Sequence, residues 1–213
     1  MMNHRGYGAH TSAVTTLNPS DKAANIVLSA GNLQATTNSG TTWTAVRATT
    51  NKSAGKFYYE VTNIVTITFP GVTGVGVGIA NSTFNLDVGT GVGSYLGYDN
   101  QGIGFFDYGA IWSNGLNVAT DTPWETAGDM AAVAVDIGAK LFWARQIPFG
   151  NWNGNPSADP ATGVGGISFP SGLTAAIFPA VCCLGSTDPE TIKINFGATT
   201  FTGSVPSGFS AWG

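Results

Sequence analysis

Histidines and cysteines are the residues of this chain best suited to nucleophilic chemistry, and their placement disfavours it. His4 and His10 are the only histidines, both lie within the first ten residues, and no Gly-x-Ser-x-Gly sequence occurs. A catalytic triad needs a histidine beside its Ser or Cys, so we expect none. Cys182 and Cys183 are adjacent in an apolar run, where strand neighbours point to opposite faces, so we expect two buried thiols rather than a disulfide.

Acidic residues near extended segments are the second set of candidates, because glycoside hydrolysis uses a pair of carboxylates. They are Glu60, Asp99, Asp107, Asp129 and Asp136. None follows the alternating carboxylate pattern of sandwich glycosidases, and Glu60 is expected on the solvent side of its strand in an ion pair. We therefore predict no enzymatic activity.

The sequence also predicts no metal ion and no cofactor. No Cys or His pair has zinc-ligand spacing, and the Asp residues form no calcium-loop ladder. Glycine-rich pieces such as 89–93 lack the spacing and the Lys-Ser/Thr of phosphate-binding loops, so we interpret them as turns.

Aromatic side chains near turns are stronger candidates, because flat rings bind sugar faces and form hot spots in protein interfaces. With their polar neighbours, the candidate binding residues are Tyr98, Asp99, Tyr108, Trp152, Asn153 and Asn155. Trp112 and Trp143 lie inside predicted strands, where core packing is favoured. Trp152 stands among asparagines and glycine, so binding and structural roles both remain open for it.

The elements that position these residues are predicted to be β-strands. In 55–61, Phe57, Tyr59 and Val61 share one face while Tyr58 and Glu60 share the other, which is the period of a half-buried strand. Further strands are predicted over 26–28, 33–36, 43–47, 64–69, 74–80, 94–98, 102–106, 110–112, 129–136, 140–145, 178–184 and 191–196. No helical period and no internal repeat occurs, so the fold class is all-β.

Glycines and turn residues refine this picture. Gly74, Gly76 and Gly78 alternate on one face of their strand, which leaves room for another backbone or for aromatic rings. Asn114 and Gly115 are typical of a tight hairpin turn. Residues 146–172 form a connection too long for an ordinary loop and are the first choice for function, whereas 201–212 are expected to pack on the edge of the sandwich.

Composition limits the partners. Only 9% of the 213 residues are charged and the net charge is −4, so we expect no nucleic-acid partner and a surface partly covered by other subunits. No apolar run is long enough for a membrane span, and the N-terminal sequence lacks a secretion signal. We expect a flexible or subunit-anchoring arm over 1–20 and a single domain over 21–213.

Several motifs occur in the order of the SPRY domain family, and the chain resembles that family over roughly residues 25–200. These motifs lie at 55–61, 75–80, 94–97, 114–115, 128–136, 141–143, 178–181 and 192–197. The resemblance implies a bent antiparallel β-sandwich of the concanavalin-like jelly-roll kind, and a non-enzymatic module that recognises partners through loops at one end. After 141–143 the chain has Ala144-Arg-Gln-Ile-Pro148 where the family usually has Asn-Gly, so no known peptide pocket carries over.

The sequences 153–157 and 160–166 are similar to those of bacterial and bacteriophage members of the family. Our leading hypothesis is therefore a structural or recognition subunit of a phage particle, in the tail, fibre or capsid decoration. It would be made in the host cytoplasm, anchored to other virion subunits by the arm, and present its loops to a host surface protein or glycan. The alternative is a lectin-like module that binds cell-surface glycan through Trp152, Tyr98 and Asp99.

Overall fold

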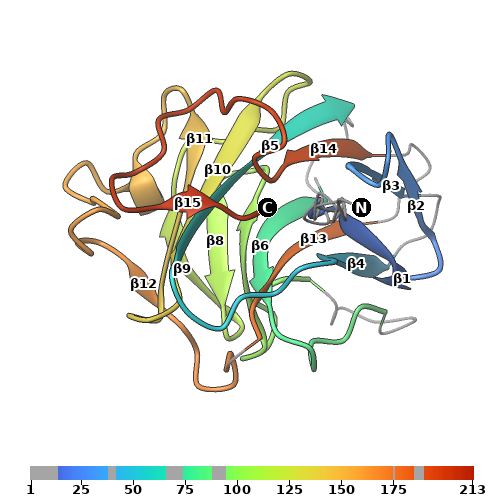
Figure 1. The fold of residues 1–213 in the computed structure, drawn as a ribbon, viewed down its shortest axis with the longest axis horizontal. Helices are drawn as coiled ribbons and strands as arrows, with labels where there is room; N and C mark the ends of the chain where they lie inside the picture. Colours follow the sequence, from blue (N-terminus) through green and yellow to red (C-terminus); the bar gives the residue numbers. More distant parts are fainter. Residues whose placement is uncertain (1–13, 38–41, 66–73, 88–94, 175, 185–189) are drawn as a thin grey trace, which may run out of the picture.

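The computed structural model describes residues 14–37, 42–65, 74–87, 95–174, 176–184 and 190–213, and it contains two β-sheets packed face to face (Figure 1). Sheet A runs in the order β1 (Leu17–Lys22), β4 (Trp43–Ala48), β13 (Phe178–Leu184), β6 (Val75–Ala80), β7 (Gly102–Phe106), β8 (Ala110–Ser113) and β9 (Leu116–Thr120). Sheet B runs in the order β12 (Ile167–Ser168), β11 (Leu141–Ile147), β10 (Met130–Asp136), β5 (Lys56–Val65), β14 (Thr191–Asn195), β3 (Gln34–Thr37) and β2 (Ile26–Ser29). Neighbours within these orders are antiparallel, which confirms the predicted all-β sandwich.

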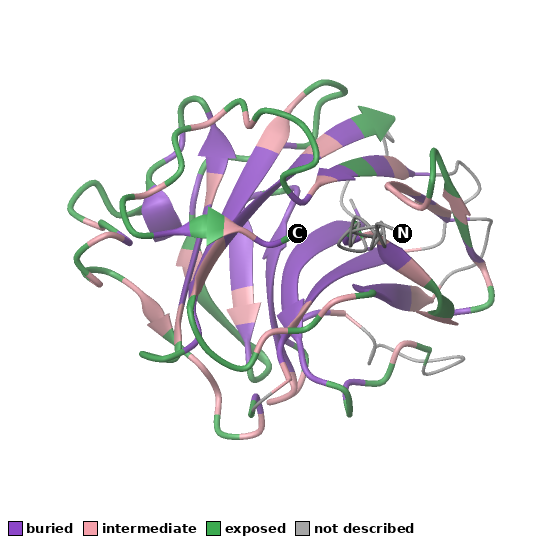
Figure 2. Cartoon of the chain, viewed as in Figure 1, coloured by how far each residue is buried: buried purple, intermediate pink, exposed green. Residues whose placement is uncertain are grey.

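The inner faces of both sheets form one hydrophobic core (Figure 2). In β5, Tyr59 and Val61 point into this core, as the alternation predicts, and in β6 the side chains of Val75, Val77 and Ile79 do the same. β10 lies between β11 and β5 and is buried on both faces, so it is a central strand of sheet B.

The glycines of β6 lie on the outer face of sheet A and allow close packing there. A Cβ atom added at Gly76 would lie 2.8 Å from the ring of Phe106, and one added at Gly78 would collide with the carbonyl of Ile103. The prediction that rings and backbone approach this face is confirmed. At the β8–β9 turn, Asn114 and Gly115 have positive φ angles of 51° and 76°, which confirms the predicted tight turn.

One predicted strand is wrong, and sheet A begins before residue 21. Tyr95 to Tyr98 form a turn instead of a strand, because Gly97 has a φ of +86° and its carbonyl accepts a hydrogen bond from the amide of Gly115. β1 begins at Leu17 and pairs with β4, so the last residues of the predicted arm belong to sheet A, while 1–13 lie outside the described residues. β9 was not predicted, since most of its residues are exposed.

Residues 197–212, here called the C-terminal segment, do not pack on an edge of the sandwich as expected. The segment crosses the outer face of sheet B and then runs parallel to β5 as β15 (Ser210–Ala211) (Figure 1). Beyond β15, Trp212 is fully buried in the core against the rings of Phe57 and Tyr59, and its indole nitrogen donates to the carbonyl of Thr50 at 3.0 Å.

This segment also overturns the expectation that Glu60 faces solvent in an ion pair. Glu60 is only 1% exposed, and its carboxylate accepts hydrogen bonds from the Tyr58 hydroxyl at 2.7 Å and from the amides of Thr202 and Gly203 at 2.9 and 2.7 Å. The carboxylate is buried because the backbone of the C-terminal segment covers it and supplies the donors. Lys56, by contrast, is half-exposed and pairs with Asp136 at 3.2 Å.

Candidate functional site

Six aromatic residues gather on the outer side of sheet A, and we call them the aromatic face. They are Trp43, Tyr95, Tyr98, Phe106, Tyr108 and Trp112. The ring of Tyr95 is central, because its centroid lies 5.2 to 5.8 Å from those of four neighbours in the set. Two predicted site residues, Tyr98 and Tyr108, thus belong to one continuous surface.

Strands and one turn hold these rings in place. Phe106 and Trp112 lie in β7 and β8 on the face that the glycines of β6 leave open, and Trp43 comes from β4. The turn at 95–98 carries two tyrosines over the sheet, with Leu96 buried between them and its amide donating to the Cys182 sulfur at 3.3 Å. The aromatic face therefore rests on hydrogen-bonded strands of sheet A.

Two tyrosines of this surface, Tyr98 and Tyr108, remain accessible. Tyr98 is 43% exposed and Tyr108 is 39% exposed, although most of the rings beneath them are buried or half-buried. Burial of part of its phenol raises the pKa of Tyr108 to about 12, and its hydroxyl accepts a hydrogen bond from the Trp112 indole nitrogen at 2.8 Å. Burial also raises the pKa of Tyr95. Such rings offer flat apolar surface together with hydroxyl groups.

Asp99 follows Tyr98 and lies at the border of this surface. One of its carboxylate oxygens accepts a hydrogen bond from the amide of Gln101 at 2.8 Å, which stabilises the turn before β7. Its side chain is half-exposed, and the residue directly follows the exposed Tyr98 in the sequence. This pair of groups could bind a hydroxyl-rich ligand or a polar peptide.

The other three predicted site residues lie elsewhere, in the 146–172 connection along the edge of β11. Trp152 is buried, and the guanidinium of Arg145 lies 4.6 Å from its ring centroid. Asn155 is exposed, and its side chain accepts a hydrogen bond from the amide of Ser157 at 2.9 Å. The structure therefore does not bring these residues together with Tyr98 and Tyr108.

Asn153 has a clear structural contact set. Its buried side chain accepts a hydrogen bond from the amide of Ala144 at 2.9 Å and donates to the carbonyls of Phe142 and Gly165 at 3.0 and 2.9 Å. Its amide group thus takes the place of a strand beside β11. This contact covers backbone groups that an open sheet edge would leave unpaired.

The thiols occupy the two faces of β13, as predicted. Cys183 belongs to the core, while Cys182 packs under the aromatic face, and both are buried and unbonded to each other. Burial raises the pKa of Cys182 to about 12 and that of Cys183 well above its ordinary value. Both thiols are therefore held in the neutral form.

Glu190, which sequence reasoning missed, forms a buried pair with Asp107 between the sheets. Its Oε1 atom accepts from the amide of Gly74 at 3.2 Å, while a carboxylate oxygen of Asp107 accepts from the next amide, that of Val75, at 3.4 Å. Burial, and then the charge of Asp107, raise the pKa of Glu190 to about 8. A single Glu before an apolar strand carries no sequence signal of this pairing.

The remaining acidic candidates are not assembled into a catalytic pair. Asp129 caps the turn before β10 by accepting from the amide of Thr126 at 3.0 Å, and Asp136 holds Lys56. Among the described residues, no group of three or more His, Cys, Asp or Glu side chains is arranged to hold a metal ion. The described part of the chain also contains no helix that is long and apolar enough to span a membrane.

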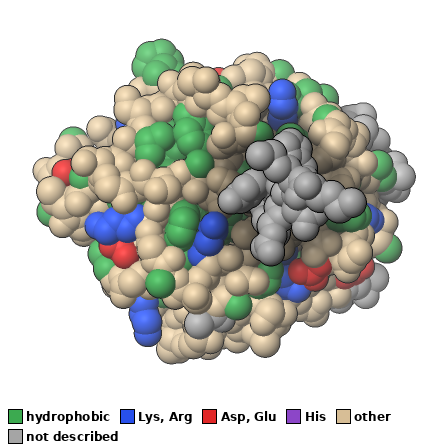
Figure 3. Space-filling view, viewed as in Figure 1, with side chains coloured by type: hydrophobic (Ala, Val, Ile, Leu, Met, Phe, Trp, Pro, Cys, Tyr) green, Lys and Arg blue, Asp and Glu red, His purple; other side chains and the backbone are tan. Residues whose placement is uncertain are grey.

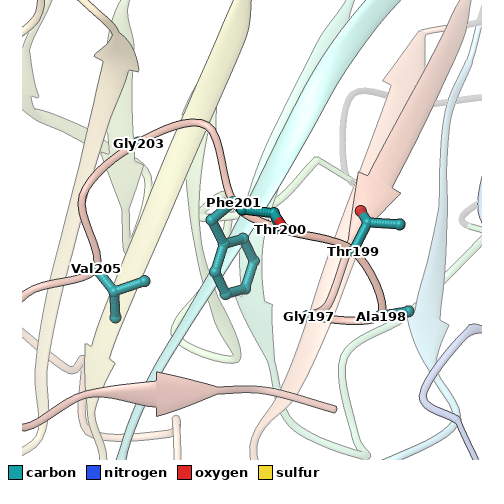
Figure 4. A pocket seen from close by; sticks show the side chains of 7 residues that line it. All are labelled: Gly197, Ala198, Thr199, Thr200, Phe201, Gly203 and Val205. Atoms are coloured by element: carbon teal, nitrogen blue, oxygen red, sulfur yellow. The ribbon is translucent and has the colours of Figure 1, made fainter.

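An open depression of about 780 Å³ lies on the C-terminal segment (Figure 4). It is lined by Gly197, Ala198, Thr199, Thr200, Phe201, Gly203 and Val205. Figure 4 shows that only Phe201 and Val205 present sizeable apolar side chains there. All residues that line the depression belong to the C-terminal segment, and none of them is one of the six predicted site residues.

Comparison with known proteins supports the β-sandwich architecture but assigns the chain to no family. No protein-family model matches the sequence, and no curated protein matches it. Among solved structures, the SPRY domain of human HERC1 has a TM-score of 0.61 and 18% identity, over 86% of this chain and 99% of that chain. The TRIM65 PSpry domain has a TM-score of 0.59 and 13% identity, over 85% and 88% of the two chains.

Stonustoxin has a TM-score of 0.59 and 17% identity, over 85% of this chain and 27% of that chain. The matches to HERC1 and TRIM65 cover nearly the whole of those domains and most of the described sandwich. Identities this low carry the fold alone and not a function. This protein therefore has the SPRY fold.

Proposed function

We propose that this protein is a non-enzymatic recognition module that binds a protein partner through its aromatic face. The observation that carries the proposal is the exposure of Tyr98 and Tyr108 within a cluster of six rings on sheet A. Aromatic residues in such clusters are the commonest anchors of protein interfaces. The SPRY fold agrees with this role, because the resemblance to that family implies partner recognition.

The proposed setting is a bacteriophage particle, in which the protein would be a tail, fibre or capsid-decoration subunit. Charged residues make up only 9% of the chain, and most of the surface in Figure 3 is neither charged nor apolar. A surface so poor in charge suits a subunit whose neighbours cover part of it. Residues 1–13, at the start of the predicted arm, would contact those neighbours, while the aromatic face would contact a host surface protein or a fellow subunit.

Purified particles from cells that make the protein provide the test of this setting. We expect the chain in the particle fraction by mass spectrometry, with cross-links from residues of the aromatic face to another subunit. Tyr98→Ala with Tyr108→Ala should abolish the cross-links, whereas Phe149→Ala, which removes an aromatic side chain that is 80% exposed elsewhere, should not. Recovery of the chain only outside any assembly would contradict the proposal.

A lectin-like module is the second candidate, favoured by the half-exposed Asp99 directly after the exposed Tyr98 in the sequence. A flat ring with an adjacent hydrogen-bond acceptor is suited to the face and hydroxyl groups of a sugar. A glycan array compares the native protein with Tyr98→Ala and with the Phe149→Ala control. Binding that only Tyr98→Ala removes would favour the glycan, and the absence of any bound glycan would leave the protein partner.

A further inference from the structure

A small cavity at the opposite end of the sandwich from the β7–β8 turn is separate from the aromatic face. It has a volume of about 190 Å³ and lies where the β10–β11 turn meets the segment between β12 and β13. Its lining residues are Ser53, Ile137, Lys140, Phe169, Leu173, Thr174 and Ile177. Four of these residues are apolar and form the floor of the cavity, and the other three are one lysine, one serine and one threonine.

The size of this cavity matches one apolar group. A cavity of about 150 Å³ in an engineered protein is large enough for benzene, so about 190 Å³ accommodates a branched or aromatic side chain. Ile137, Leu173 and Ile177 are buried, and the amide of Phe169 donates to the carbonyl of Lys140 at 2.9 Å. These contacts preform the walls, which lowers the cost of binding.

The charges around the cavity favour an anion. Lys52, Lys56 and Lys140 lie at this end of sheet B or beside it, and the nearby carboxylate of Asp136 is engaged by Lys56 at 3.2 Å and by the amide of Ala139 at 2.9 Å. Lys52 lies over the ring of Phe57 at 4.8 Å. Within the described part of the chain, the exposed Lys140 has no carboxylate partner, and the hydroxyls of Ser53 and Thr174 have no hydrogen-bond partner.

We infer that this cavity binds the C-terminal residue of a protein partner, with its apolar side chain on the floor and its terminal carboxylate at Lys140. Lys140 lines the same cavity of about 190 Å³ as the four apolar residues, so a single residue of the partner can supply both the apolar group and the anion. A C-terminal residue such as Leu or Phe carries the two groups on one Cα atom. Recognition of a chain terminus by charge and a side-chain pocket is an established mode of peptide binding.

Short peptides and NMR spectroscopy test the inference on the full chain. The probes are acetyl-Gly-Ser-Gly-X peptides with Leu, Ile, Phe or Ala at X, each made as the free acid and as the amide. We expect the Leu, Ile or Phe acid to shift the amide resonances of Ile137, Lys140 and Leu173, and to bind about tenfold more tightly than its amide, as a charge-assisted hydrogen bond implies. The Ala peptide should bind more weakly.

Variants assign the effect to the cavity. Lys140→Gln should reduce the affinity for the acid peptide to that for the amide peptide, because Lys140 is exposed and the substitution removes only its charge. Lys193→Gln, at an exposed site on β14, is the control and should change the affinity for neither peptide. Thr174→Phe should block binding by filling the cavity. Absence of binding by every acid, or equal binding of acid and amide, would overturn the inference. Tighter binding of 4-methylpentanoate than of any peptide would also overturn it, by assigning the cavity to small free acids.

Discussion

Side chains alternate between the inner and outer faces in both sheets, yet the outer face of sheet B is covered and the outer face of sheet A is partly exposed. On sheet B, Tyr58 and Glu60 are buried because the C-terminal segment crosses them and supplies two backbone donors. On sheet A, the rings around Tyr95 are only partly covered, and Tyr98 and Tyr108 remain exposed. The difference is that the chain itself covers one face, while it leaves two rings of the other face exposed.

The largest expected effect comes from Trp212, which belongs to the closed side of the comparison. Trp212→Ala should lower the free energy of unfolding by about 3 to 5 kcal/mol, because it leaves a cavity in the core. Urea denaturation followed by circular dichroism measures this loss. Trp112→Ala on the aromatic face is the matched control and should cost clearly less, since that ring is only half-buried. Equal losses would remove the distinction between the two faces.

Glu60 provides the next largest effect. Glu60→Gln should cost about 2 kcal/mol of unfolding free energy, because the amides of Thr202 and Gly203 lose a charged acceptor in a buried site. Tyr58→Phe removes only one donor to the same carboxylate and should cost less. Hydrogen exchange should show faster exchange at Thr202 and Gly203 in Glu60→Gln, and unchanged exchange there would argue against the carboxylate as the anchor of the segment.

Glu190 can be compared with Glu60, because both side chains are buried but Glu190 accepts a hydrogen bond from one backbone amide and Glu60 from two. Its pKa is about 8 in the folded chain against an ordinary value of 4.5, so the folded state holds a proton that the unfolded state releases between these values. The free energy of unfolding should therefore fall as the pH rises from about 5 to about 8, by at most about 1.4 kcal/mol per pH unit. Urea titrations at several pH values should show this slope in the native protein and a smaller one in Glu190→Gln.

The smallest effect on stability is expected on the open face. Tyr98→Ala and Tyr108→Ala should each change the free energy of unfolding by less than about 1 kcal/mol, because much of each side chain is already in solvent. The same variants should weaken partner binding strongly. A large loss of stability in these variants would mean that the tyrosines complete the fold rather than a binding surface.

The period-2 pattern was sufficient to predict which side chains of β5 and β6 face the core, because each alternation is local. It could not predict the burial of Glu60, whose donors lie 142 and 143 residues further along the chain. Trp152 and Asn153 stand in a sequence of polar turn residues, and their burial depends on the unpaired edge of β11, which no local pattern reveals. The sequence identified Tyr98 and Tyr108 of the aromatic face. It could not show that Tyr95 and Trp112 connect them, because that contact depends on how the strands of sheet A are paired.

The distance in sequence between Glu60 and Gly203 has a consequence for how the chain acquires its structure in time. β5 must remain without its cover until residues about 143 positions later have been made and have returned to it. Contacts of such long range are associated with folding over milliseconds to seconds rather than microseconds. During that interval the apolar side of β5 around Tyr58 is open to other newly made chains. The yield of folded protein should therefore fall as the concentration of newly made chains rises, so a lower level of expression should favour the soluble product.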